Sequence, residues 1–269
     1  MKICGSLAGT ILPIYVAFCI SCSSNRSAGS TDNDCLYQFS TIQSLAAGNF
    51  YGTVSVADFV KYGTLGLGTF VGANGEMIVL DGVCYQALGN GQVQKASLSD
   101  SVPFGAVTYF DNDYSYSFDN ITFVEIQDSL TGIIKDKGAN SFYACRIDGE
   151  FQYMKVRSVL KQEPPYCTLA EAVKTSQREY EYSNVKGTVV ALYCPEYAGN
   201  VNAAGWHMHF ISDDRTKGGH IMDFVMSEGQ VQIDRTNMFM MTLPETESFN
   251  RLNLSGLDDD IDKIEKGKK

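Results

Sequence analysis

Short runs in which apolar and polar residues alternate dominate this chain of 269 residues, and glycine, asparagine and aspartate residues separate them. Alternation with a period of two is typical of β-strands that bury one face. Asn74-Gly75, Asp81-Gly82 and Asp148-Gly149 are expected to form tight hairpin turns, so the sheets should be largely antiparallel. The pattern predicts strands at residues 66–71, 77–80, 83–87, 105–110, 121–124, 141–147, 150–160, 185–193, 205–212, 220–226, 230–233 and 238–243.

Helical signals are few and short, and they begin near residues 42, 55, 126 and 168. The fold class that follows is α/β (α+β type), with mixed, largely antiparallel β-sheets in two subdomains and a few short helices. Pro164-Pro165 interrupts the pattern. We therefore predict an N-terminal β-rich subdomain at 35–163 and a C-terminal subdomain at 164–269.

The first 22 residues are predicted to be an export signal and are excluded from the fold. Lys2 supplies a positive charge, and the apolar stretch at 7–20 is too short to span a bilayer comfortably. Ser21-Cys22 resembles the processing site of a bacterial lipoprotein, in which Cys22 would carry the lipid. Cleavage as an ordinary secretory signal is the alternative. Residues 23–34 are polar and predict a flexible tether.

These features predict an exported protein, periplasmic or at the cell surface, whose contact with the membrane is a lipid anchor at Cys22. With 44% hydrophobic and 19% charged residues the chain can bury a core, which excludes an intrinsically disordered protein. Its formal net charge of −10 argues against a nucleic-acid partner, because such binding depends on neutralising phosphates.

The cysteines that follow Cys22 predict neither a disulfide framework nor a zinc ribbon. Their number is odd, and none of them forms a Cys-x-x-Cys motif. Cys84, Cys145 and Cys194 lie in apolar strand-like runs, where cysteine behaves as a small buried hydrophobic residue.

All three histidines of the chain fall within 14 residues. In the strand predicted at 205–212, alternation places His207 and His209 on one face. A four-residue loop at 213–216 would place His220 directly opposite His209 on the returning strand of a β-hairpin. Three neutral nitrogen ligands without a nearby cysteine match a catalytic zinc site with an open position. Surface or core histidines without a metal are the alternative, and a loop of odd length with a bulge would break the pairing.

An open metal site also needs a group that moves protons and a cation that binds an anionic substrate. Glu76 follows the Asn74-Gly75 turn, and its alternative role is that of a solvated turn residue. Arg157 lies in a predicted strand, on the face that also carries Phe151, and could equally be a surface side chain. Glu265 lies in a charged tail with helical spacing of apolar residues, where exposure is the default.

Six runs of residues stand out along the chain: Leu36-Tyr-Gln-Phe-Ser-Thr-Ile, Gly66-Leu-Gly-Thr-Phe70, Gly75-Glu-Met-Ile-Val-Leu-Asp-Gly82, Pro103-Phe104, Gly187-Thr188 and Gly205-Trp-His-Met-His-Phe-Ile-Ser-Asp-Asp-Arg-Thr-Lys-Gly-Gly-His220. Together they resemble the α-acetolactate decarboxylase family, and the resemblance extends from about Cys35 to the C-terminal tail. In that family three histidines hold a metal, usually zinc, and they correspond here to His207, His209 and His220. The resemblance also assigns the family's glutamate in a Gly-Glu-Met run to Glu76, its strand arginine to Arg157 and, less securely aligned, a second glutamate to Glu265.

The resemblance implies a homodimer with one zinc ion per chain that converts 2-acetolactate to (R)-acetoin and carbon dioxide. Zinc would act as a Lewis acid, Arg157 would bind the carboxylate, and Glu76 or Glu265 would deliver the proton. A zinc-dependent hydrolase that uses the same histidines is the competing enzyme hypothesis. A non-enzymatic surface lipoprotein that binds metal or glycans is the competing hypothesis outside enzymes.

Overall fold

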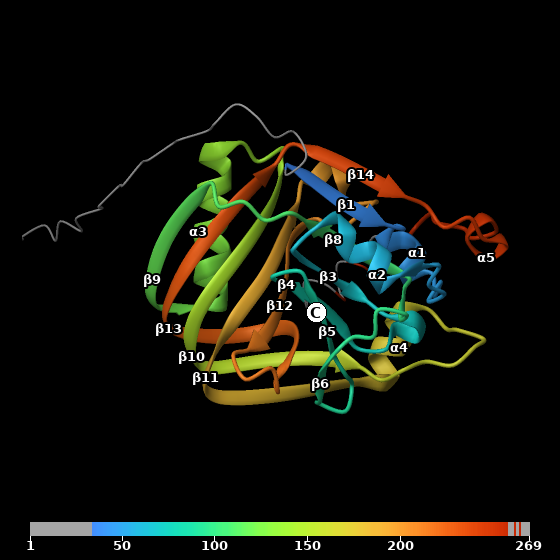
Figure 1. The fold of residues 1–269 in the computed structure, drawn as a ribbon, viewed down its shortest axis with the longest axis horizontal. Coiled ribbons are helices and arrows are strands. Elements are labelled where there is room, and N and C mark those ends of the chain that lie inside the picture. The colour runs from blue at the N-terminus through green and yellow to red at the C-terminus, as the bar shows by residue number, and fades with distance from the viewer. Residues whose placement is uncertain (1–33, 258–260, 262–263, 265–269) are drawn as a thin grey trace, which may run out of the picture.

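Two large β-sheets, with helices at their faces and edges, make up most of the described part of the molecule (Figure 1). The computed structural model describes residues 34–257, 261 and 264. The predicted export signal, Cys22, the tether up to residue 33 and Glu265 lie outside these residues. No helix among the described residues is long and apolar enough to cross a membrane.

The first sheet has seven strands and is built mainly from the N-terminal part of the chain. Its order is β14-β1-β8-β3-β4-β5-β6, antiparallel except for the parallel pair of β1 and β14. The strands are β1 (Cys35–Phe39), β3 (Leu65–Thr69), β4 (Glu76–Leu80), β5 (Val83–Ala87), β6 (Val93–Lys95), β8 (Phe104–Thr108) and β14 (Met238–Thr242). A small separate ladder pairs β2 (Val54–Ser55) with β7 (Ser101–Val102).

The second sheet contains long, curved strands that lie together on one side of the molecule (Figure 1). Its order is β10-β11-β12-β13-β9, and β10 also pairs with β13. The strands therefore close on themselves as a small barrel-like layer. They are β9 (Tyr114–Thr122), β10 (Phe142–Val159), β11 (Gln177–Cys194), β12 (Gly205–Ser212) and β13 (Gly218–Thr236).

The helices are short, and most begin at a side-chain cap. The longest, α3 (Phe123–Lys137), starts with a Thr122–Glu125 capping box and buries Ile126, Leu130 and Ile134 against the second sheet. The others are α1 (Ile42–Ala46), α2 (Val56–Phe59), α4 (Leu169–Ser176), α5 (Glu247–Asn250) and the 3₁₀ turns η1 (Val60–Tyr62), η2 (Val71–Ala73) and η3 (Glu196–Ala198).

The fold class predicted from the sequence is confirmed, because largely antiparallel sheets and short helices make up the structure. The strand pairing does not divide the chain near Pro164, however. Strands β9 and β10 precede that residue but pair with β11 and β13, so sheet membership changes between residues 108 and 114, and it changes back between residues 236 and 238, where β14 joins the first sheet. Local turn signals cannot reveal which distant strands pair.

Two predicted hairpin turns are wrong. Strand β10 runs without interruption through Asp148-Gly149, because Gly149 pairs with Gly187 on one side and Gly229 on the other. The connection from β3 to β4 spans residues 70–75 and includes η2, so Asn74-Gly75 ends a longer loop. At Asp148-Gly149, strand pairing on both sides outweighs the local preference for a turn. At Asn74-Gly75, the turn residues belong to a longer loop that contains a 3₁₀ turn.

Apolar side chains from both sheets pack against each other between the layers. Leu67 and Ile78 of the first sheet share one buried cluster with Val190 and Ile211 of the second. The odd-numbered residues of β12 face this interface, while Met208 and Phe210 pack in the separate core of the second sheet, to which α3 contributes. The histidines of β12 therefore project between the two sheets.

Candidate active site

The hairpin of β12 and β13 brings the three histidines together. His209 lies directly opposite His220 in the register of the two strands. The amide of Ser212 donates to the carbonyl oxygen of Lys217 at 2.9 Å, which leaves a four-residue loop at 213–216. The hairpin geometry predicted from strand alternation and loop length is thus confirmed.

The histidine nitrogens are spaced as a common ion requires. His207 Nε2 lies 3.1 Å from His209 Nε2 and 3.1 Å from His220 Nδ1, and the three nitrogens lie within 4.8 Å of one another. Nitrogens that bind zinc tetrahedrally at about 2.0–2.1 Å are separated by about 3.3 Å. The three side chains are buried, with exposed fractions of 7%, 0% and 3% for His207, His209 and His220. The donor set and its spacing therefore fit a divalent transition metal.

The protonation state of the histidines also suits a metal. Burial, and then the nearby positive charge of Arg157, lower the pKa of His207 to about 3, so its imidazole is neutral at physiological pH. His209 Nδ1 donates a hydrogen bond to the carbonyl oxygen of Met77 at 2.8 Å, which leaves the lone pair on Nε2. Strand β4 of the first sheet thus fixes the tautomer of a histidine on the second.

Glu76 is the first residue of β4 and projects into the same interior space. Its Oε2 lies 3.6 Å from His209 Nε2, and its exposed fraction is 9%. Gly75 immediately before it has φ +79°, and a Cβ at that position would lie 2.4 Å from the carbonyl oxygen of Ala87. Thr69 Oγ1 donates to the carbonyl oxygen of Gly75 at 2.8 Å. Glycine and this hydrogen bond together set the position of Glu76.

Arg157 enters the site from β10, where it lies opposite His220 on β13. Its exposed fraction is 5%, and its Nη1 lies 3.7 Å from Glu76 Oε1. The prediction that Arg157 and Phe151 share a face is wrong. Met154, three residues before Arg157, lies on the opposite face of the strand, and Phe151 packs in the same core as Met154. The β10–β13 register shifts around residues 150–153, which breaks the simple alternation.

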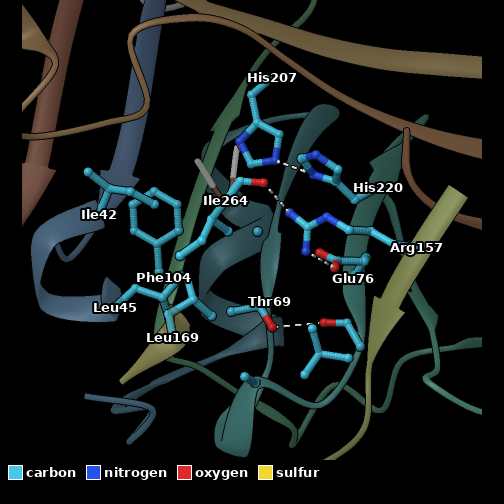
Figure 2. Close-up of a pocket in the computed structure, with 14 residues that line it drawn as sticks. Ile42, Leu45, Thr69, Glu76, Phe104, Arg157, Leu169, His207, His220 and Ile264 are labelled. Atoms are coloured by element: carbon cyan, nitrogen blue, oxygen red, sulfur yellow. Dashed lines mark hydrogen bonds and ion pairs between the residues drawn. The ribbon is translucent and has the colours of Figure 1, made fainter. Parts of the chain in front are cut away.

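A small chamber is lined by Glu76, Arg157, His207 and His220, and we call it the inner chamber (Figure 2). Its volume is about 30 Å³. Arg157 Nη2 donates to the carbonyl oxygen of Ile264 at 3.2 Å, so the C-terminal segment reaches the site. Polar side chains of Thr69, Glu76, Arg157, His207 and His220 line one part of the chamber, and apolar side chains of Ile42, Leu45, Phe104, Leu169 and Ile264 line the rest.

Five of the six residues predicted from the sequence thus meet in one place, and Glu265 lies outside the described residues. The sequence analysis missed Thr69 and Ile264. Thr69 stands inside one of the quoted motifs, so its sequence position already pointed to it. Ile264 had only the apolar spacing of the tail as a signal, and that spacing does not show which surface the tail contacts.

Solved structures resemble the chain over nearly its whole described length. Alpha-acetolactate decarboxylase from Bacillus subtilis strain 168 is 35% identical with a TM-score of 0.83, covering 86% of this chain and 99% of that one. A Staphylococcus aureus protein of unknown function, described as similar to alpha-acetolactate decarboxylase, is 29% identical with a TM-score of 0.82, covering 86% of this chain and 100% of that one. The shared fold and the site define an enzyme of the carbon–carbon lyase class, a carboxy-lyase.

Sequence comparison identifies the family within that class. The model of the alpha-acetolactate decarboxylase family matches residues 36–256, and the chain belongs to this family. The alpha-acetolactate decarboxylase of Methanosarcina mazei is 41% identical over 87% of this chain and 81% of that protein. That of Bacillus subtilis is 35% identical over 83% of this chain and 87% of that protein.

Proposed function

We propose that this protein converts (S)-2-acetolactate (2-hydroxy-2-methyl-3-oxobutanoate) into (R)-acetoin and carbon dioxide, with one zinc ion per chain. The observation that carries the proposal is the buried guanidinium of Arg157, which lies beside Glu76 and on the strand position opposite His220. Membership of the alpha-acetolactate decarboxylase family supports the choice of substrate.

Arg157 is the group that binds the substrate carboxylate. Its planar guanidinium can donate two parallel hydrogen bonds to a carboxylate, which fixes the orientation as well as the position of the substrate. A buried cation also offsets the unfavourable long-range field of a chain with a formal net charge of −10. Because Arg157 already contacts Glu76 and the carbonyl oxygen of Ile264, the incoming carboxylate competes for donors that are held in place.

His207, His209 and His220 are the residues that would hold the metal. A bound zinc ion supplies Lewis acidity, which favours loss of carbon dioxide from a 3-oxo acid by polarising the neighbouring oxygen atoms. The hydrogen bond from His209 to Met77 orients one imidazole before any ion arrives. The low pKa of His207, at about 3, means that no proton has to leave this imidazole at neutral pH.

Glu76 is the proton donor that we propose for the carbon that loses carbon dioxide. Breaking the carbon–carbon bond leaves an electron pair on the substrate. Glu76, which takes up a proton from solvent when the substrate carboxylate replaces it at Arg157, delivers that proton to one face of the carbon and so sets the chirality of the product. The carboxyl group of Glu76 lies beside both Arg157 and His209, on one wall of the inner chamber. Glu265 is the second candidate, because it directly follows Ile264 in the chain.

An assay of acetoin formation tests the function. Purified wild-type protein loaded with zinc should release acetoin from acetolactate, lose the activity with a chelator and regain it with zinc, whereas His209→Ala should remain inactive. If the zinc-loaded wild type makes no acetoin, the decarboxylase proposal is wrong. Hydrolysis of esters by the same protein would then favour the zinc hydrolase, and metal binding without either activity would favour the non-enzymatic lipoprotein.

We also propose that the protein is exported and carries a lipid on Cys22. The support is the sequence alone, in which a short apolar stretch ends at Ser21-Cys22. Wild-type protein expressed from its full sequence should partition with membranes, and Cys22→Ala should move to the soluble fraction. Unchanged partition of the variant would contradict the lipid anchor.

A homodimer is the assembly that we propose, with β14 at its interface. This edge strand of the seven-stranded sheet has β1 as its only partner among the described strands. Met238, Phe239 and Met240 on it have exposed fractions of 51%, 36% and 43%. An apolar edge strand offers unpaired backbone groups to a second copy. Light scattering should give twice the mass of one chain, and Met240→Lys should shift the protein toward the monomer.

A further inference from the structure

A second, larger cavity borders the inner chamber. We call it the outer groove, and its volume is about 590 Å³. It lies where β12 and β13 diverge and α3 covers the gap, and apolar side chains such as Phe123, Trp206 and Met222 line it. On the same measure the inner chamber has a volume of about 30 Å³. Most of the free space beside His220 is therefore in the outer groove.

Three residues line both cavities, namely Arg157, His220 and Ile264. Arg157 and His220 are opposite each other on paired strands, so the sheet holds them. Ile264 belongs to the C-terminal segment and is held differently. Its carbonyl oxygen accepts a hydrogen bond from Arg157, and its side chain packs against a buried cluster that includes Leu45 and Phe104. Ile264 is thus the part of the shared wall that does not belong to a sheet.

The polar and apolar walls of the inner chamber suit different parts of a bound 2-hydroxy-3-oxo acid. Its carboxylate and other oxygen atoms suit Arg157 and the histidines, whereas its alkyl substituents have to face the apolar wall to which Ile264 belongs. Behind that side chain lies the outer groove, whose lining is also largely apolar. The size of the side chain at position 264 therefore decides whether a longer substituent meets a wall or open space.

We propose that Ile264 separates the inner chamber from the outer groove and thereby limits the length of the alkyl substituent on the substrate. The assignment of a 2-hydroxy-3-oxo acid as the substrate rests on the proposed function. Ile264 is a specificity-determining residue in this proposal, and the outer groove is the space that its side chain withholds from the substrate.

Activity on two substrates tests the proposal. The wild type and Ile264→Ala are compared on acetolactate and on the analogue with a propyl group in place of the 2-methyl group. The wild type should prefer acetolactate, and Ile264→Ala should reduce this preference in kcat/KM by roughly tenfold or more. Ile261→Ala is the matched control, because Ile261 is buried in the same cluster but is not among the described residues that line either cavity.

Binding of inert acids provides a readout that does not need turnover. Calorimetry on zinc-loaded protein compares 2-hydroxy-2-methylpropanoate with 2-hydroxy-2-methylhexanoate, neither of which has a keto group. Ile264→Ala should improve binding of the longer acid relative to the shorter one by roughly tenfold, and Ile261→Ala should not. An unchanged ratio in Ile264→Ala, or an equal change in both variants, would overturn the proposal. Absence of acetoin with the wild type would instead contradict the proposed function, while the binding comparison would still decide the role of Ile264.

Discussion

Arg157 and Glu76 come from different sheets, and their side chains meet in the interior, with Nη1 and Oε1 3.7 Å apart. Their exposed fractions are 5% and 9%. Removing one partner of a buried ion pair leaves the other charge without compensation and far from water. The ion pair therefore contributes both to the stability of the fold and to the geometry of the site, because each residue holds the other in position next to the histidines.

Replacing Arg157 by glutamine is expected to affect both activity and stability. Loss of the contact to the carboxylate should lower kcat/KM for acetolactate by at least about a hundredfold. The free energy of unfolding should fall by about 3 kcal/mol, because the carboxylate of Glu76 loses its cation. Steady-state kinetics and urea unfolding measure the two effects.

Lys155→Gln is the matched control for that variant. Lys155 lies on the same strand, and its Nζ is 2.8 Å from Oε2 of the more exposed Glu179. An ion pair of this kind contributes less than about 1 kcal/mol. Equal losses in the two variants would contradict a special role for Arg157.

Glu76→Gln separates proton delivery from metal binding. The variant keeps the shape of the side chain but cannot act as an acid, so kcat should fall by about 10²- to 10⁴-fold. The zinc content per chain should stay unchanged, because the three histidines remain. Glu265→Gln is measured in parallel. If it abolishes turnover while Glu76→Gln does not, the proton comes from the C-terminal tail.

Gly75→Ala tests the backbone conformation that positions Glu76. At φ +79°, with the new Cβ 2.4 Å from the carbonyl oxygen of Ala87, alanine should destabilise the fold by about 2 kcal/mol or more and reduce activity. Gly132→Ala is the control, because it lies in α3 and a Cβ there would meet nothing within 4 Å. That change should stabilise the protein by about 0.5–1 kcal/mol. Similar melting temperatures for the two variants would show that Gly75 is not strained.

The buried carboxyl group of Asp234 should make the stability of the folded protein depend on pH, independently of catalysis. Its side chain is fully buried in β13, and one oxygen accepts a hydrogen bond from the amide of Asp111 at 3.2 Å. Burial is the main cause that raises its pKa from 3.8 to about 8; the hydrogen bond from the Asp111 amide opposes this to a smaller extent, and the carboxylates of Asp113, Asp34 and Asp111 add lesser increases. The folded protein therefore holds a proton that the unfolded chain releases between these two values. The contribution of this bound proton to the free energy of unfolding is therefore fully present below pH 3.8, and it is lost as the pH rises through about 8.

Urea unfolding between about pH 5 and pH 9 tests this assignment. The contribution of Asp234 to the free energy of unfolding should decrease by about 1.4 kcal/mol per pH unit over most of that range. Asp234→Asn should lack this contribution and should be more stable than the wild type at the alkaline end. Asp223→Asn, an exposed position on the same strand, should follow the wild type. Parallel curves for the wild type and Asp234→Asn would contradict the buried proton.

Local rules were sufficient for the metal site but not for the strand boundaries. Strand alternation puts His207 and His209 on one face, and an even loop puts His220 opposite His209, so three nearby residues needed only local geometry. At Asp148-Gly149 the same kind of local rule predicted a turn. There β10 continues, because neighbours on both sides satisfy its backbone groups, and a short turn motif carries no information about them.

The sequence by itself determined the family motifs, the largely antiparallel strands and the face shared by the histidines, because these depend on residue type and short spacing. Only the tertiary structure decided that Glu76 and Arg157 lie beside those histidines and that Ile264 forms part of their chamber. These residues come from separate elements far apart in the chain. The packing of the two sheets, and of the C-terminal segment against them, brings the residues together.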